Sequence, residues 1–408
     1  MAPDPPRPAD RRLPRAVLAA SLLAGLGHLL TFPLANPAQL GIATDVYYHA
    51  GTAFLAGEPF YGVTPPAHPA FAFLYPPPLI VAAIPYALAG SERGAFVLGL
   101  VTSVPAALAV GVLSIRLARQ ADVALTRTEQ ALTMAVPLVS VPAATTLLTG
   151  QVNLLLVLAL AVGTVAVERD EEIVGGISMA AAALVKVFPA LVGAWLLRRR
   201  AWRAIGAALV TGSGVLGAGL LLLGPAPYAT YFGTVVPEEL AIRAFVEGPT
   251  AETRFAGLRR ELSALFPALP RSALLPTAMA IVTPPVVAAS RRMETLCARL
   301  VALEAVVVAI LLVLSLEPFY VALALFPTVP LVFLLGPGWP RRLFLAGVVL
   351  TLVPITWHAV GTLAGLLPAG GRLIRAALRP LFTVLTPTGL GLWLLLGACV
   401  LAQRPDGV

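Results

Sequence analysis

Charged residues are scarce in this chain: Asp, Glu, Lys and Arg make up 12% of its 408 residues, about half the share of a soluble domain. Hydrophobic residues make up 58%, and the mean hydropathy is +0.89. A soluble fold of this length has too little interior to bury so much apolar surface, whereas a lipid bilayer accommodates it. The composition therefore excludes an ordinary soluble protein and predicts an integral membrane protein.

Metal-binding and nucleotide-binding patterns are also missing. The two cysteines, Cys297 and Cys399, lack metal-ligand spacing and indicate no disulfide framework, so we interpret both as packing residues. The four histidines are scattered and give no metal-site spacing. The chain contains no Gly-rich phosphate loop, GxSxG elbow or HExxH motif. We therefore expect no metal site and no cytoplasmic nucleotide-handling domain.

Long apolar runs recur along the whole chain. They predict an all-α integral membrane fold, a polytopic bundle of about twelve transmembrane helices, because helices satisfy their own backbone groups in lipid. We treat residues 1–408 as a single transmembrane domain with a cytoplasmic tail at residues 1–14. The runs cover residues 15–34, 71–90, 94–117, 129–148, 151–167, 173–197, 203–223, 272–290, 298–316, 318–336, 341–360 and 381–402.

The basic residues, 28 against 20 acidic, cluster as arginines between the apolar runs. This pattern is typical of cytoplasmic loops beside anionic lipids and argues against a nucleic-acid partner. It places residues 35–70 and 224–271 outside, as two long outer loops. The inside loops are marked by Arg11 to Arg15, Arg198 to Arg203, Arg291, Arg292 and Arg299, Arg341 and Arg342, and Arg404. The stretch from Arg116 to Arg127 conflicts with this scheme, because counting helices puts it outside. A hairpin or re-entrant segment between residues 71 and 197 would change that count.

The first outer loop carries a carboxylate beside an aromatic helix. Asp45 follows the first span, and the residues after it, including Tyr48 and His49, predict a short amphipathic helix that ends at Gly57. Such a helix lies at headgroup depth, where partial desolvation makes a carboxylate more basic. Asp45 is therefore a candidate general base for a sugar hydroxyl. The alternative is that Asp45 merely caps the helix.

Two further polar interruptions stand beside apolar runs. Tyr75 precedes three prolines, which predict an extended, rigid start to the next helix. Gln151 and Asn153 follow Gly150 in the run LLTGQVNLLL. Both side chains could hydrogen-bond a polar ligand, but a polar turn between two helices explains them equally well.

Lys186 is the only lysine, and it lies within an apolar run, where a charge is costly and is usually functional. It could bind a lipid phosphate as a point charge. Snorkelling towards the interface, or pairing with a carboxylate, would also account for it. Glu317 and Tyr320 follow a later span and are expected on the same outer side as Asp45. Glu317 could line a cavity or be an ordinary helix-start carboxylate.

The order of these segments resembles glycosyltransferase family 87, polyprenyl-phosphomannose-dependent α-mannosyltransferases of the glycosyltransferase C superfamily. The resemblance rests on an Asp before Tyr-Tyr, then Tyr-Pro-Pro, then Gly-Gln-Val-Asn-Leu-Leu, then Leu-Val-Lys-Val-Phe-Pro with an Arg-Arg-Arg loop. It covers roughly residues 15–336 and is strongest over 40–203.

The resemblance implies a multi-pass plasma-membrane enzyme with its active site outside. It implies a polyprenyl-phosphate-linked sugar donor, a lipid or glycan acceptor, surrounding membrane lipids, and no cofactor. It assigns the catalytic base to Asp45 and the donor phosphate to Lys186. Tyr48, His49, Tyr75, Gln151, Asn153, Glu317 and Tyr320 are then further substrate-binding candidates.

One departure from the family concerns a late histidine near the active site. Here the comparable stretch, residues 315–320, contains Glu317 and Tyr320 but no histidine, which leaves the donor sugar open. Two other functions compete with the enzymatic one. A transporter or lipid flippase would explain the helices and Lys186. A non-catalytic subunit of an envelope glycan assembly complex would tolerate the loss of Asp45.

Overall fold

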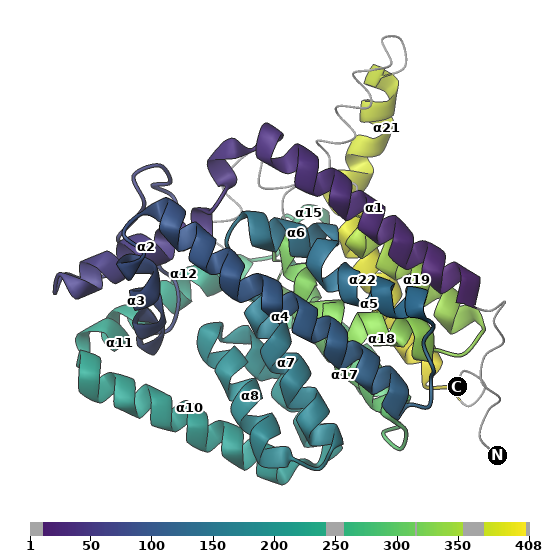
Figure 1. Cartoon of the computed structure of the whole chain (residues 1–408). Coiled ribbons are helices and arrows are strands. Elements are labelled where there is room, and N and C mark those ends of the chain that lie inside the picture. Colours follow the sequence, from purple (N-terminus) through teal and green to yellow (C-terminus); the bar gives the residue numbers. More distant parts are fainter. Residues whose placement is uncertain (1–10, 242–256, 315, 354–370, 405–408) are drawn as a thin grey trace.

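The computed structural model describes residues 11–241, 257–314, 316–353 and 371–404, and over these residues the protein is all-helical, without strands (Figure 1). The first half contains α1 (Arg12–Ala35), α2 (Ile42–Leu55), α3 (Ile80–Leu88), α4 (Glu92–Gln120), α5 (Arg127–Val139), α6 (Val141–Leu148), α7 (Asn153–Glu168), α8 (Glu172–Val185), α9 (Gly193–Arg199) and α10 (Trp202–Leu223). The second half contains α11 (Ala226–Thr230), α12 (Val236–Ala241), α15 (Leu258–Leu265), α16 (Arg271–Ala289), α17 (Leu296–Leu314), α18 (Leu325–Leu334), α19 (Trp339–Leu352), α21 (Gly371–Val384) and α22 (Pro387–Ala402). Short 3-10 or π helices connect them: η2 (Pro37–Gln39), η3 (Pro77–Leu79), η4 (Phe188–Val192), η5 (Tyr231–Val235) and η6 (Pro318–Ala324).

Five of the described helices are long and apolar enough to cross a membrane: α1, α4, α10, α16 and α17. A sixth candidate is the pair α5 and α6, which is bent by 42°. The predicted number of about twelve spans is not confirmed, because the other apolar runs form shorter or divided helices. The predicted run 341–360 continues past the end of α19 into residues outside the described part.

The fraction of buried residues distinguishes the central helix α17 from the peripheral helix α10. In α17, 83% of the most apolar 18-residue window is buried, compared with 6% in α10. α17 packs against α16, α18 and α22, whereas α10 packs mainly on α8 at the edge of the bundle (Figure 1). An apolar helix with so few protein neighbours is stable only where lipid covers it.

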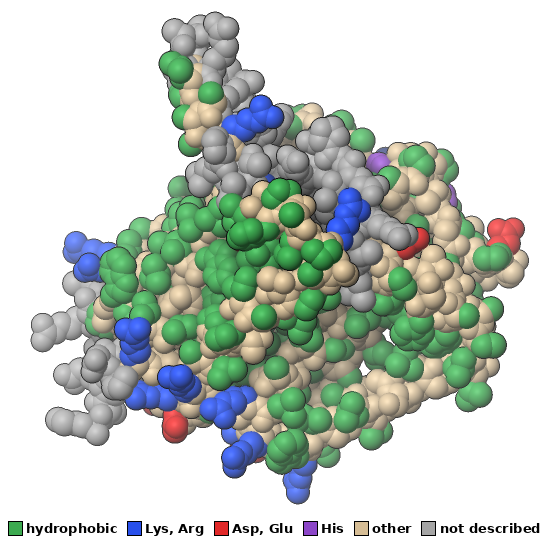
Figure 2. Space-filling view, turned by 180° about the vertical axis from the view of Figure 1, so that it is seen from behind, with side chains coloured by type: hydrophobic (Ala, Val, Ile, Leu, Met, Phe, Trp, Pro, Cys, Tyr) green, Lys and Arg blue, Asp and Glu red, His purple; other side chains and the backbone are tan. Residues whose placement is uncertain are grey.

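Arginine-rich loops meet at one end of the bundle. Arg198 donates from Nε to the carbonyl oxygen of Ser290 at 2.8 Å. Nη2 of Arg299 lies 2.6 Å from Oε2 of Glu168. In Figure 2 most of the visible Lys and Arg side chains lie along one edge, and hydrophobic side chains cover much of the adjoining face. Loops that were predicted to share the cytoplasmic side therefore lie together.

The stretch from Arg116 to Arg127 also lies at this end. Nε of Arg15 is 3.0 Å from Oε1 of Glu129 at the start of α5. Arg11 donates from Nη1 to the carbonyl oxygen of Ala124 at 2.6 Å. The α4–α5 connection is thus adjacent to the start of α1, and counting spans from hydropathy put it at the wrong end.

The short helix α3 explains part of this discrepancy. The predicted span at residues 71–90 contains a helix of only nine residues, Ile80–Leu88, which rises about 14 Å. α3 packs mainly against α2, with smaller contacts to η3 and α4, rather than passing through the bundle. The proline run before it takes up the rest of the apolar segment. The chain therefore leaves α1, folds α2 and α3 at the far end, and returns through α4.

The predicted span at residues 173–197 is a helical hairpin. Its two ends meet, because the backbone N–H of Arg203 donates to Oε2 of Glu172 at 2.9 Å. α8 ends before Lys186, whose backbone is extended (φ −139°, ψ 130°). Pro189 follows in η4, and proline cannot continue the helix across this point. Lys186 consequently occupies the tip of the hairpin.

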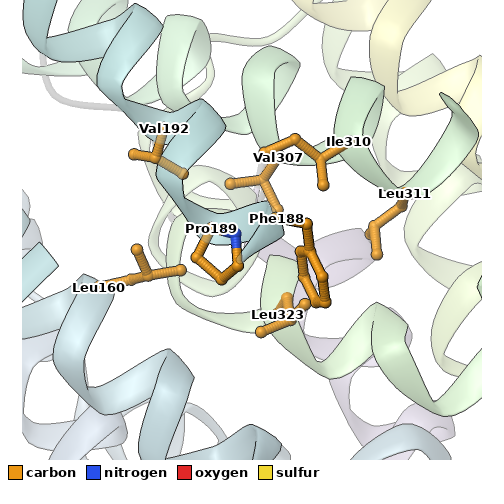
Figure 3. A pocket seen from close by; sticks show the side chains of 8 residues that line it. All are labelled: Leu160, Phe188, Pro189, Val192, Val307, Ile310, Leu311 and Leu323. Atoms are coloured by element: carbon orange, nitrogen blue, oxygen red, sulfur yellow. The ribbon is translucent and has the colours of Figure 1, made fainter. Parts of the chain in front are cut away.

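The returning limb of the hairpin is anchored by apolar packing. Figure 3 shows Phe188, Pro189 and Val192 of this limb around a small space that is completed by other helices. The remaining lining residues are Leu160, Val307, Ile310, Leu311 and Leu323. All eight side chains are apolar, so this space offers no polar group to a sugar. Packing of these side chains holds the hairpin against α7 and α17.

The predicted helix of the first outer loop is present as α2. It begins at Ile42, slightly before the expected start, and ends at Leu55, followed by Gly57 in the left-handed region (φ 76°). The second outer loop, residues 224–271, contains α11, α12 and α15, while residues 242–256 lie outside the described part. α21 stands away from the body of the bundle in Figure 1.

Candidate active site around Lys186 and Asp45

The start of α2 is fixed to the turn after α6. The backbone N–H groups of Gly41 and Ala43 donate to the carbonyl oxygens of Leu148 and Thr149, both at 2.9 Å. The first amides of a helix have no partner within it, so these bonds stabilise the start of α2. Gly150 completes the turn with φ 71°, a conformation that glycine adopts without strain.

Lys186 is the centre of the first group of polar residues. Its Nζ donates to Tyr320 OH at 2.8 Å, Asn153 Oδ1 at 3.0 Å and Gln151 Oε1 at 3.3 Å. The residue is 8% exposed. The hairpin tip, the turn after α6, the start of α7 and η6 thus converge on one buried ammonium group. Oxygen acceptors at this spacing offset the cost of burying the charge.

Tyrosine rings surround the same ammonium group. Nζ of Lys186 lies 4.2 Å from the ring centroid of Tyr320 and 5.6 Å from that of Tyr75, within cation–π range. The hydroxyls of Tyr75 and Tyr47 are 2.5 Å apart. Tyr61 donates to the carbonyl oxygen of Tyr75 at 2.7 Å, which fixes the extended segment before the prolines. Burial raises the pKa of Tyr47, so this hydroxyl stays neutral and acts only through hydrogen bonds.

Asp45 belongs to a second group of polar residues on α2. Its side chain is 10% exposed, and its Oδ2 lies 3.9 Å from Nε2 of His68 in the outer loop. The pKa of Asp45 is raised to about 6, mainly because burial desolvates the carboxylate and also because of the charge of Glu92, while His49 acts in the opposite direction. Nε2 of His49 is 2.7 Å from Oε1 of Glu92. Gly41, not Asp45, holds the N-cap position, so capping does not explain the carboxylate.

The two groups face different sides of α2. Asp45 and Tyr47 are two residues apart, which separates their side chains by about 200° around the helix axis. Tyr47 contacts Tyr75 and Tyr86, on the side of Lys186. Asp45 faces His68 and the first turn of α4. One short helix thus carries a basic carboxylate on one side and a tyrosine of the lysine group on the other.

Most predicted site residues fall into these two groups. The structure joins Lys186 to Gln151, Asn153, Tyr75 and Tyr320. Asp45 and His49 lie in the second group, where the Tyr48 ring meets His49 edge-on at 5.1 Å. Glu317 occupies the N-cap position of η6, three residues before Tyr320, and is partly buried.

Sequence reasoning missed Tyr47, His68 and Glu92. Tyr47 directly precedes a predicted residue, and the helical period of α2 would have separated its face from that of Asp45. No sequence signal distinguished His68 or Glu92. Among the described residues no cluster of three or more His, Cys, Asp or Glu side chains is placed to hold a metal ion.

The fold and these groups define a helical membrane protein with a buried cation, amide and tyrosine hydroxyl groups, and a weakly acidic carboxylate near one end of the bundle. The model of glycosyltransferase family 87 matches residues 73–318, more than half of the chain. The protein therefore belongs to glycosyltransferase family 87 and is a membrane glycosyltransferase. The matched range includes Lys186, whereas Asp45 and Tyr320 lie outside it. No curated protein and no solved structure matches the chain.

Proposed function

We propose that this protein transfers a hexose, with mannose as the first candidate, from a polyprenyl-phosphate sugar to a lipid or glycan acceptor at the outer face of the plasma membrane. The observation that supports this most is the position of Lys186. The only lysine of the chain lies at the tip of a hairpin, among two amides and two tyrosines, close to the first outer loop.

Lys186 binds the donor phosphate in this proposal. An ammonium group suits a phosphate as a point charge, and the three partners described above, Gln151, Asn153 and Tyr320, are neutral groups that a phosphate oxygen can replace. Gln151, Asn153 and Tyr320 then retain hydrogen-bonding capacity for sugar hydroxyls. Tyr75 offers a ring face beside them. The reaction calls on no cofactor, because the leaving group is a phosphate whose charge Lys186 balances.

Asp45 is the proposed base. With a pKa of about 6 it is mostly ionised at neutral pH, yet it is more basic than an ordinary aspartate. It takes the proton of the acceptor hydroxyl while the acceptor oxygen bonds to the anomeric carbon. The bond from that carbon to the phosphate oxygen breaks, and polyprenyl phosphate leaves with the electron pair. One displacement of this kind inverts the anomeric configuration.

The separation of the two groups agrees with such a displacement. In an in-line attack the base and the group that binds the leaving phosphate stand on opposite sides of the anomeric carbon. Asp45 and the lysine group face different sides of the first turns of α2. The acceptor would approach from the side of the outer loop, and the donor from the side of the hairpin tip.

A product analysis distinguishes transfer from flipping. Purified protein in liposomes is given a polyprenyl-phosphate [14C]mannose and a membrane lipid extract as acceptor, and the labelled lipids are then hydrolysed with mild acid. A glycosyltransferase moves the label from an acid-labile glycosyl phosphate into an acid-stable glycoside. A flippase leaves every label in the acid-labile donor, and that result would reject the proposal.

A further inference from the structure

The imidazole of His68 lies beside the carboxylate of the proposed base. Nε2 of His68 lies 3.9 Å from Oδ2 of Asp45, and the two side chains are 12% and 10% exposed. This distance is too long for a hydrogen bond but within the range of an ion pair. Contacts of catalytic groups often tighten only when substrate is bound.

The outer loop holds His68 in place through its backbone. The N–H of His68 donates to the carbonyl oxygen of Pro65 at 2.9 Å, and the N–H of Phe71 donates to that of His68 at 3.0 Å. The His68 ring meets the Phe71 ring edge-on at 6.4 Å. Prolines at positions 65, 66 and 69 restrict the segment further. His68 is therefore presented by a constrained turn.

The other side of the pair is equally constrained. The backbone N–H of Asp45 donates to the carbonyl oxygen of Gly41 at 2.9 Å, in the turn of α2 that is fixed to the end of α6. Three titratable groups among the described residues act on Asp45: His68 from the loop, His49 from α2 itself, and Glu92 from α4. His49 is engaged with Glu92 at 2.7 Å. His68 is thus the imidazole that remains directed at the base.

We propose that His68 is a positioning residue for Asp45 and receives the proton that Asp45 takes from the acceptor. The inference rests on the proposed function. Asp45 binds the hydroxyl proton as the glycosidic bond forms and passes it to the lone pair on Nε2 of His68. The imidazolium then loses a proton to water. Asp45 is again ionised, and no other reactant is consumed.

The proximity of His68 to Asp45 predicts the direction in which the pH dependence of kcat shifts when His68 is replaced. A positive charge beside a carboxylate favours the ionised carboxylate, so His68 lowers the pH at which Asp45 becomes a working base whenever the imidazole carries a second proton. His68→Gln should shift the acidic limb of the kcat profile upward by about 0.5 to 1 pH unit. His68→Lys, which keeps a positive charge at every pH, should shift it downward. In His68→Gln, kcat at neutral pH should fall on the order of ten-fold, with KM for the donor unchanged.

The matched control is His28→Gln. His28 lies in α1, where its Nε2 is 2.8 Å from the hydroxyl of Thr145, and it is not one of the three groups named above that act on Asp45. Its replacement should leave the pH profile unchanged. The proposal would be overturned if the acidic limb of the kcat profile had the same midpoint in wild type and His68→Gln. It would also be overturned if His28→Gln shifted that midpoint as much as His68→Gln does. The thermal stability of each purified variant shows whether a loss of activity comes from misfolding. If His68→Gln is misfolded, His68→Asn takes its place in the comparison.

A second readout does not depend on turnover. The chain has six aspartates, and in [13C]aspartate-labelled protein the Asp45 carboxyl signal is identified by its loss in Asp45→Asn. Its titration midpoint should rise in His68→Gln and stay constant in His28→Gln. If wild type transfers no sugar but the midpoint rises, the proposed function fails and the pair stands. If transfer occurs and the midpoint does not move, the pair fails and the function stands.

Discussion

Replacing Lys186 with methionine removes the ammonium group but keeps an unbranched side chain of similar length. Three hydrogen bonds, at 2.8, 3.0 and 3.3 Å, are lost. Hydrogen bonds from a charged donor contribute about 1.5 to 3 kcal/mol each, and relief from burying the charge, which costs several kcal/mol, offsets most of this loss. We therefore expect the free energy of unfolding to change by less than about 2 kcal/mol.

The effect of Lys186→Met on sugar transfer should be much larger. A hydrogen bond from a charged donor contributes about 2 to 3 kcal/mol, which corresponds to a 30- to 150-fold loss. The assay measures initial transfer rates over a range of donor concentrations, with thermal unfolding of the same detergent-solubilised samples.

The control for Lys186→Met is Arg198→Met, which removes one positive charge at the other end of the bundle. Within the described part of the chain, Arg198 donates to the backbone oxygens of Ser290 and Arg291. Transfer should stay within about three-fold of wild type in this variant. If Lys186→Met also stays within three-fold at every donor concentration, the reasoning about the donor phosphate is refuted.

Two other predictions concern the fold around α2. The pKa of Asp45 is raised from 3.8 to about 6, mainly by desolvation, so its ionisation destabilises the fold by up to about 3 kcal/mol once the pH exceeds 6, and by little below pH 4. In chemical denaturation, Asp45→Asn should therefore be more stable than wild type at pH 8 but not at pH 4. Equal stability of the two proteins at pH 8 would contradict the burial of the Asp45 carboxylate. Gly150→Ala should destabilise by about 2 kcal/mol or more and reduce transfer, because its φ is 71° and a Cβ would lie 2.8 Å from the Thr44 side chain. Gly57→Ala has the same backbone strain (φ 76°), but its Cβ would meet no atom within 4 Å, so it should destabilise the fold less and leave sugar transfer intact. If both variants behaved alike, the turn at Gly150 would have no specific role in sugar transfer.

The lysine group was largely predictable from residue chemistry. A single lysine in an apolar run, and amides that interrupt another run, are costly in lipid unless they meet one another or a ligand. The structure joins Lys186 to Gln151 and Asn153 as that cost requires. The helix after Asp45 was predictable too, because aromatic and small residues repeat with a helical period before Gly57.

The path of the chain was less predictable. Hydropathy counts apolar residues but not their direction, so a hairpin of two short helices and one long span give the same signal. The run around Lys186 is such a hairpin, and the run at residues 71–90 contains a nine-residue helix. The arginines from Arg116 to Arg127 were the one sign in the sequence that the count of spans before them was wrong. His68 was not predictable, because its approach to Asp45 depends on the three-dimensional fold of a proline-rich loop.

The central claim is that Asp45 activates the acceptor in a sugar transfer from a polyprenyl-phosphate donor. The most direct measurement is transfer of radiolabel from polyprenyl-phosphate [14C]mannose to endogenous membrane lipids, with wild type and Asp45→Asn at equal expression. We predict transfer by wild type and a loss of at least 100-fold in Asp45→Asn, as expected on removal of a general base. Equal transfer by both would remove Asp45 from the mechanism and contradict the account.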